Sequence, residues 1–180
     1  MKDLFLKVDG VSTEEQAVLW SINAALQRNK VYKNDYSNEF RMRFHNEWAK
    51  LIRKESEPYR QQGSQPASDE RHCAAIGRIS DELSNTFGEY LSGGRLRFGT
   101  SQKAFNCYLK YLWALKIAPM PPHCPIDSVV LTRASIEGSW TKSDSQKEYM
   151  GWINQIRKQV SLAEWENEVW LRWRLSNSGF

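Results

Sequence analysis

The residues best suited to chemistry lie on one strongly apolar stretch, residues 100 to 115. Lys103, Asn106 and Lys110 fall at i, i+3 and i+7, so a helix would place all three on one face. A lysine in apolar surroundings loses proton affinity by desolvation and becomes nucleophilic at neutral pH. Burial in such a helix would therefore favour a reactive amine at Lys103. The alternative is that these residues form the single solvated face of an otherwise buried helix.

A carboxylate follows further along the chain, in the segment Pro125-Ile126-Asp127. Proline suits the first turn of a helix, which we expect over residues 126 to 134. The amino-terminal end of a helix stabilises an ionised aspartate. Such a carboxylate could stabilise the oxocarbenium-like centre that forms when a glycosidic bond breaks. Alternatively, Asp127 serves only to begin the helix.

Residues 99 to 106 (GTSQKAFN), followed by Pro125-Ile126-Asp127, resemble the helix-hairpin-helix DNA glycosylases. In that superfamily a glycine-containing hairpin leads into a helix bearing a lysine and often an asparagine three residues later. A loop then leads to a Pro-Val-Asp-like segment. The resemblance implies a glycosylase-like fold, with Lys103 as the Schiff-base nucleophile and Asp127 as the catalytic carboxylate. The nucleic-acid-binding residues that follow from it are Gly99, Thr100, Ser101, Gln102, Asn106 and Lys110.

The sequence departs from the family pattern in three ways. Ser101 replaces the second hairpin glycine, the segment between Lys103 and Asp127 is longer, and the cluster cysteines of some members are absent. The stretch FGTSQKAFNCYLKYLW is also similar to a family of small bacterial proteins.

Composition bounds the possible partners. The 180 residues fit one domain, and 41% of them are hydrophobic. No apolar run is long enough to span a bilayer, and the charged amino terminus is too short for a signal peptide, so we expect a cytoplasmic protein without a membrane partner. Three cysteines without a Cys-x-x-Cys pair make a poor disulfide or zinc framework. We therefore expect neither a metal nor a cofactor.

Charge and aromatic content point to nucleic acid. The net charge of +4 suits a phosphate-bearing partner such as double-stranded DNA, and the chain contains eight tryptophans. An extruded base needs an aromatic pocket, for which Phe105, Tyr108 and Trp113 are candidates unless the core contains them. Trp165, Trp170 and Trp173 lie too densely for one helical stripe. One of them could be exposed as a contact for nucleic acid or a protein partner.

The remaining pattern predicts an all-α single domain over residues 1 to 180, because no segment alternates as a strand would. Capping boxes beginning at Ser12, Ser143 and Ser161 indicate three helix starts, and Ser37 and Ser68 indicate two more. The first of these helices should bury Val18, Leu19, Ile22, Ala25 and Leu26. The stripe Phe40, Phe44, Trp48, Leu51 and Ile52 marks the second, which should stop before Pro58. Residues 58 to 68 are expected to form a loop.

Three functions are consistent with these features. The first is a DNA glycosylase, or glycosylase/lyase, acting on a damaged or modified base. The second is a non-catalytic nucleic-acid-binding protein on a related helical scaffold. The third is a protein-interaction module, for example in phage defence. The position of Lys103 relative to Asp127 separates the first two, because only an enzyme needs both groups in one cleft. A basic rim on the cleft would separate these two from the third.

Overall fold

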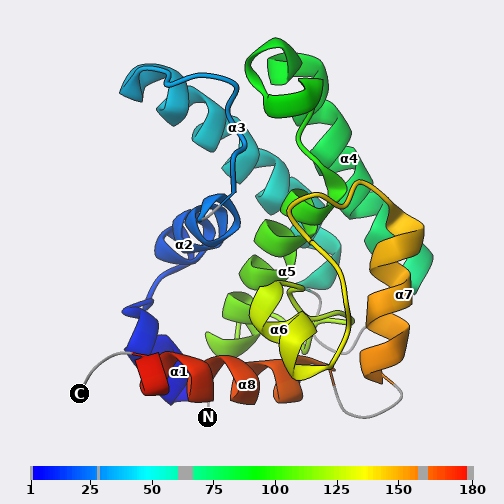
Figure 1. Ribbon diagram of the computed structural model, residues 1–180. Coiled ribbons are helices and arrows are strands. Elements are labelled where there is room, and N and C mark those ends of the chain that lie inside the picture. The colour runs from blue at the N-terminus through cyan, green and yellow to red at the C-terminus, as the bar shows by residue number, and fades with distance from the viewer. Residues whose placement is uncertain (1, 28, 61–66, 158–161, 178–180) are drawn as a thin grey trace.

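Helix α5 (Phe98–Ala114) forms the axis of the computed structural model, which describes residues 2–27, 29–60, 67–157 and 162–177 (Figure 1). Every residue of α5 is buried. An almost continuously apolar sequence predicts this central position, because such a helix has no face suited to water. The other helices surround α5, and this confirms the predicted all-α fold.

The amino-terminal helices cover one side of α5. Helix α1 (Lys2–Asp9) was not predicted, because its eight residues carry four charges and only a short apolar pattern. It is held by Phe5, whose ring stacks on that of Tyr111 at 4.9 Å. Helix α2 (Glu14–Leu26) lies along α5. Its capping box uses Thr13 and Gln16, one residue later than predicted, and leaves Leu19 exposed rather than buried.

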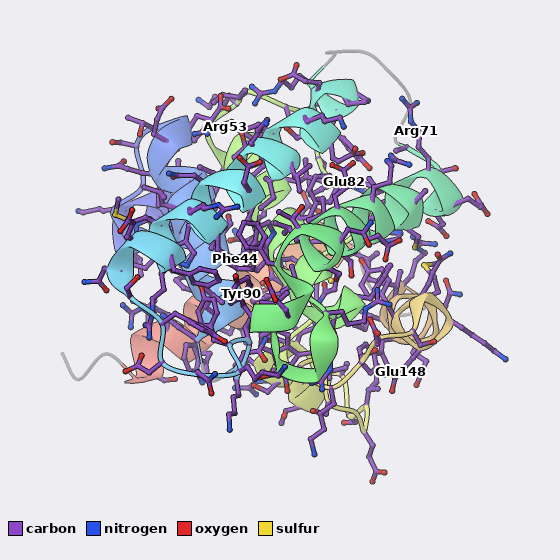
Figure 2. All side chains as sticks on the ribbon, turned by 90° about the horizontal axis from the view of Figure 1, so that it is seen from above. Phe44, Arg53, Arg71, Glu82, Tyr90 and Glu148 are labelled. Atoms are coloured by element: carbon purple, nitrogen blue, oxygen red, sulfur yellow. The ribbon has the colours of Figure 1, made fainter. Side chains whose placement is uncertain are left out.

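Helices α3 (Asn38–Ser56) and α4 (Asp69–Phe87) pack together over another side of α5. Ser37 and Ser68 cap them as predicted. Phe44 points into the middle of the molecule between these helices and α5 in Figure 2, whereas Arg71 projects outward. Short 3-10 helices follow each of them, at Glu57–Tyr59 after α3 and at Gly88–Tyr90 and Ser92–Gly94 after α4.

The carboxy-terminal part contains α6 (Ser128–Arg133), α7 (Gln146–Arg157) and α8 (Leu162–Asn177). Helix α8 lies across the base of the molecule beside α1 (Figure 1). The predicted capping box at Ser143 is shifted: Ser145 accepts from the Glu148 amide, and Ser143 donates to the Glu148 carboxylate. The predicted capping box at Ser161 lies outside the described residues.

Eight α-helices therefore build the described part of the chain, and the β-pairing found within it is a single bridge between Tyr32 and Leu91. Among the described helices, none has the length and apolarity needed to cross a membrane. In the same part of the chain, no group of three or more His, Cys, Asp or Glu side chains is arranged to hold a metal ion.

Candidate active site

Lys103 and Asp127 meet although 24 positions separate them in the sequence. Lys103 Nζ lies 2.5 Å from Asp127 Oδ2, with the two side chains 6% and 16% exposed. Lys103 comes from the second turn of α5, and Asp127 from the loop that begins α6. The structure thus brings together the two residues predicted to be catalytic.

The helix start fixes the other carboxylate oxygen. Asp127 is the N-cap of α6, and its Oδ1 accepts a hydrogen bond of 3.0 Å from the amide of Val130. One oxygen is therefore held by a helix terminus and the other by an ammonium group. Both interactions favour the ionised carboxylate.

The pair also sets both proton affinities. Burial alone would lower the pKa of Lys103, but the adjacent Asp127 carboxylate outweighs it and holds the pKa above its ordinary value. Burial alone would raise the pKa of Asp127, but Lys103 and the Val130 amide lower it by more than burial raises it. The pKa of Asp127 therefore lies below its ordinary value. The prediction that desolvation makes Lys103 a free amine is therefore wrong for the resting protein. The ammonium must lose a proton before it can act as a nucleophile.

The pair opens onto a cleft. Two adjoining hollows of about 330 and 240 Å³ share Lys103, Gln27 and two tryptophans, Trp170 and Trp173, in their walls. Asp127 lines the larger hollow, together with Trp140 from the loop between α6 and α7. The smaller hollow extends toward Trp20 on α2. The cleft thus lies between α2, α5, α8 and the 138–141 segment.

The cleft obtains its aromatic wall from residues other than those predicted. Phe105 and Tyr108 are fully buried in the core. Trp113 is 9% exposed and lies beneath the ammonium of Lys2, 3.9 Å from the ring centre. The predicted pocket of these three residues is therefore wrong, because α5 directs them into the core or toward α1. Trp170 and Trp173 of α8 do line the cleft, and Trp165 lines a separate hollow with Arg133 and Arg172.

The structure gives Gly99 a packing role that differs from its predicted role in binding nucleic acid. Its amide donates to the Ser143 carbonyl at 3.0 Å, and the Phe98 amide donates to Asp144 at 2.9 Å. A Cβ at Gly99 would lie 1.9 Å from the Trp140 carbonyl oxygen. Because Gly99 has no side chain, residues 139–143 can pass close over α5. The Gly99 amide already donates its hydrogen bond to Ser143. Direct capture of a DNA phosphate by this amide is not supported.

Gly99→Ala is expected to destabilise the protein, because the atom that the new Cβ meets is backbone and cannot rotate away. Overpacking of this kind costs about 1–3 kcal/mol. Thermal unfolding measures the effect. Gly151→Ala is the matched control, because Gly151 lies on α7 with no atom within 4 Å of the added Cβ. That variant should melt at or slightly above the wild-type temperature. A Gly99→Ala variant as stable as the Gly151→Ala control would contradict this account.

The polar face of α5 is buried rather than solvated. Asn106 is fully buried, and its amide nitrogen donates to Tyr149 Oη at 2.9 Å and to the Cys124 carbonyl at 3.2 Å. Lys110 is 3% exposed and pairs with Glu166 at 2.9 Å. The alternative of a solvated face is therefore wrong. Direct contact of these two side chains with a duplex is not supported either, because other partners already hold them.

The same correction applies to the remaining hairpin residues. Thr100 is 2% exposed and accepts from the Asn29 side chain at 2.9 Å. Ser101 is fully buried, and its hydroxyl has no hydrogen-bond partner in the described part of the chain. Gln102 is fully buried and binds the backbone of Ile126. These side chains organise the interior behind the cleft, where a nucleic acid cannot touch them.

No family model, no curated protein and no solved structure matches this chain. We therefore build its function on the geometry of Lys103, Asp127 and the cleft.

Two residues that line the cleft, Trp20 and Trp140, were not identified from the sequence. Trp20 lies off the buried stripe of α2 formed by Val18, Ile22 and Ala25, and is 38% exposed. A large aromatic side chain on the outer face of an amphipathic helix was the available signal. Trp140 lies in an irregular segment, where no periodicity relates it to the site.

Proposed function

We propose that the protein is a DNA glycosylase with an associated lyase activity, acting on a damaged or modified base in double-stranded DNA. The observation that carries the proposal is the contact of Lys103 with Asp127 at 2.5 Å beside a tryptophan-lined cleft. The resemblance of residues 99–127 to helix-hairpin-helix glycosylases supports it. An amine and a carboxylate in one cleft are the two groups that this reaction requires.

In this mechanism Asp127 remains ionised and stabilises positive charge as the bond between C1′ and the base nitrogen breaks. The electron pair of that bond leaves with the base, which takes up the proton that Lys103 carries at rest. The free amine then forms a bond to C1′. Opening of the sugar ring gives a protonated Schiff base on Lys103. Water then takes a proton from C2′, the electrons of the C2′–H bond form the C2′–C3′ double bond, and the C3′–O bond breaks with its electron pair leaving on the phosphate. Hydrolysis of the Schiff base by a second water releases the lysine.

The tryptophans provide a place for the extruded base. An enzyme that acts on a base must take it out of the duplex and hold it between apolar or aromatic side chains. Trp140, Trp170 and Trp173 line the cleft beside the Lys103–Asp127 pair. A base stacked there would place its C1′ near the amine.

Binding to duplex DNA is expected to weaken steeply with salt. A chain of net charge +4 binds DNA through phosphates, and each phosphate contact releases counterions on binding. The dissociation constant, measured by fluorescence anisotropy with a labelled duplex, should rise by about an order of magnitude or more between 50 and 200 mM salt. An affinity independent of salt, or no binding at the lowest salt, would contradict a nucleic-acid role.

The proposal is tested with duplexes that each contain one modified base, incubated with the protein and borohydride. Borohydride reduces the Schiff base, so a protein–DNA adduct is expected with at least one duplex. A second candidate is a non-catalytic nucleic-acid-binding protein, favoured by the low exposure of the Lys103 side chain, 6%. Salt-dependent binding without base release or an adduct on any duplex would support that candidate instead.

A further inference from the structure

Gln102 connects the two halves of the proposed active site. Its Nε2 donates to the Ile126 carbonyl at 2.7 Å, and its Oε1 accepts from the Ile126 amide at 3.1 Å. The side chain is fully buried. Both backbone groups of one residue are thus held by both ends of one amide.

The place of these bonds in the sequence gives them their significance. Gln102 directly precedes Lys103, and Ile126 directly precedes Asp127. A shift of Ile126 along α5 would move Asp127 relative to Lys103 by a similar distance. The 2.5 Å contact between the two charged groups tolerates little such movement, because an ion pair of this kind depends on its geometry.

A second amide fixes the orientation of the first. Asn106, one helical turn after Gln102, donates from Nδ2 to Gln102 Oε1 at 3.2 Å. Its Oδ1 contacts His72 Nε2 at 2.8 Å. Burial lowers the pKa of His72 to about 3, so the ring is neutral at physiological pH. Tyr59 Oη lies 2.9 Å from His72 Nδ1 and can donate to it. The neutral ring then carries its proton on Nε2 and donates it to Asn106 Oδ1, which holds the Asn106 amide in one orientation.

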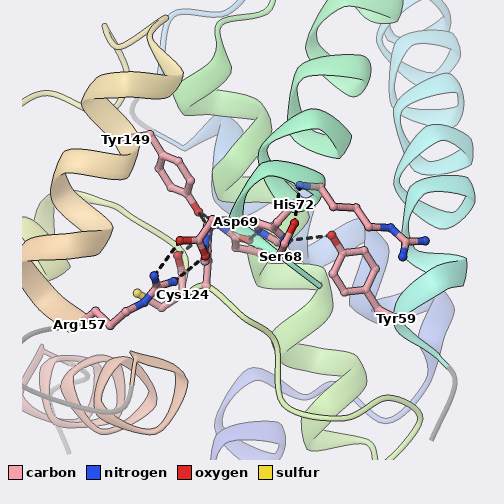
Figure 3. Close-up of polar contacts among 10 residues, drawn as sticks. Tyr59, Ser68, Asp69, His72, Cys124, Tyr149 and Arg157 are labelled. Carbon is pink, nitrogen blue, oxygen red and sulfur yellow. Dashed lines mark hydrogen bonds and ion pairs between the residues drawn. The ribbon is translucent and has the colours of Figure 1, made fainter. Parts of the chain in front are cut away.

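The network extends from Asn106 to the molecular surface. Tyr149 Oη contacts His123 Nδ1 at 2.8 Å, and His123 Nε2 contacts Asp69 Oδ1 at 3.0 Å. Asp69 also accepts two hydrogen bonds from Arg157 on α7 (Figure 3). Buried polar networks whose members all have partners favour one arrangement of the chain. This network therefore gives Gln102 a rigid support.

We propose that Gln102 is a positioning residue, which holds Asp127 against Lys103 by binding the backbone of Ile126. The proposal rests on the proposed function for the purpose of the pair, but the geometry can be tested without any substrate. When Gln102 is removed, Ile126 is released from α5 while Asn106 still holds Cys124, and Asp127 moves away from Lys103. Lys103 then loses the carboxylate that holds its proton.

The test measures the reactivity of the Lys103 amine toward an N-hydroxysuccinimide ester by peptide mass spectrometry. Gln102→Met keeps the length of the side chain but makes neither bond to Ile126. Only a deprotonated amine reacts, and each unit by which the pKa of Lys103 falls increases the free fraction about tenfold. We expect labelling of Lys103 at least several-fold faster in Gln102→Met than in the wild-type protein.

Ser80→Ala is the matched control. Ser80 is fully buried, and its hydroxyl also binds a loop carbonyl, that of Leu96, far along the chain from the 124–127 segment. It should reduce thermal stability without changing Lys103 labelling. Labelling is compared only between variants that circular dichroism shows to be folded. Equal acceleration in both variants would indicate general loosening and overturn the proposal.

A second variant serves if Gln102→Met does not fold. Gln102→Glu can keep both bonds while its introduced carboxyl is protonated, and loses the donor to Ile126 when that carboxyl ionises. Labelling of Lys103, relative to wild type at each pH, should therefore become faster as pH rises through that ionisation. Labelling equal to wild type at every pH would overturn the proposal. Failure of the wild-type protein to release any base would leave this result intact and overturn only the proposed function.

Discussion

Asp127→Asn is expected to slow base release about 100- to 1000-fold, the usual cost of losing one preorganised electrostatic group. The amide keeps the shape of the carboxylate and can still accept from the Val130 amide, since asparagine caps helices about as well as aspartate. It cannot carry the negative charge that stabilises the oxocarbenium-like centre. Single-turnover excision on a substrate that the wild-type protein cleaves measures the loss.

The same substitution should preserve the lyase step. Without the carboxylate, burial acts on Lys103 with its largest opposing influence removed, so the pKa of Lys103 falls and the amine is more often neutral. Asp127→Asn should therefore still form a borohydride-trapped adduct on DNA with a preformed abasic site. Glu55→Gln is the control for exchanging a buried carboxylate, because Glu55 pairs with Arg78 between α3 and α4. Wild-type excision rates in Asp127→Asn would refute the mechanism.

Lys103→Gln is expected to abolish covalent trapping, both on damaged duplexes and on preformed abasic sites. An amide nitrogen cannot form the Schiff base, so strand cleavage by elimination should be lost with it. Base release should fall less than in Asp127→Asn if water can replace the amine at C1′. Gel electrophoresis after borohydride treatment measures trapping.

Lys147→Gln provides the control for loss of a lysine. Lys147 is exposed at the start of α7, away from the residues that line the cleft. It should trap DNA as the wild-type protein does. Trapping retained by Lys103→Gln would show that another amine is the nucleophile.

Sequence periodicity predicted most of the fold because the helices bury regular stripes. The stripe through Phe44 and Trp48, and the largely apolar α5, leave few alternatives to helices packed around a central one. Helix α1 was not predicted because contacts with distant segments hold it, among them Phe5 stacked on Tyr111 and the hydrogen bond from Tyr111 to Asp9. The shifts at Thr13 and Ser145 have a local reason, since several neighbouring Ser and Thr residues could each cap the same helix.

The central pair of the site could be predicted from the sequence, but the residues around the pair and its environment could not. Lys103 and Asp127 were identified from sequence, and their contact places both at one cleft. Spacing along a helix could not reveal that Gln102 and Asn106 face inward, because their partners, Ile126 and Tyr149, come from distant segments. The raised pKa of Lys103 depends on the same long-range meeting with Asp127.

The most direct test of the proposed function is to locate the covalent bond. A borohydride-trapped adduct, digested and analysed by tandem mass spectrometry, should contain the DNA remnant on the Nζ of Lys103. The wild-type protein should give this adduct on a duplex with its preferred modified base, and Lys103→Gln should give none. A remnant on any other residue, or base release without an adduct on any duplex, would contradict the assignment of Lys103 as the nucleophile.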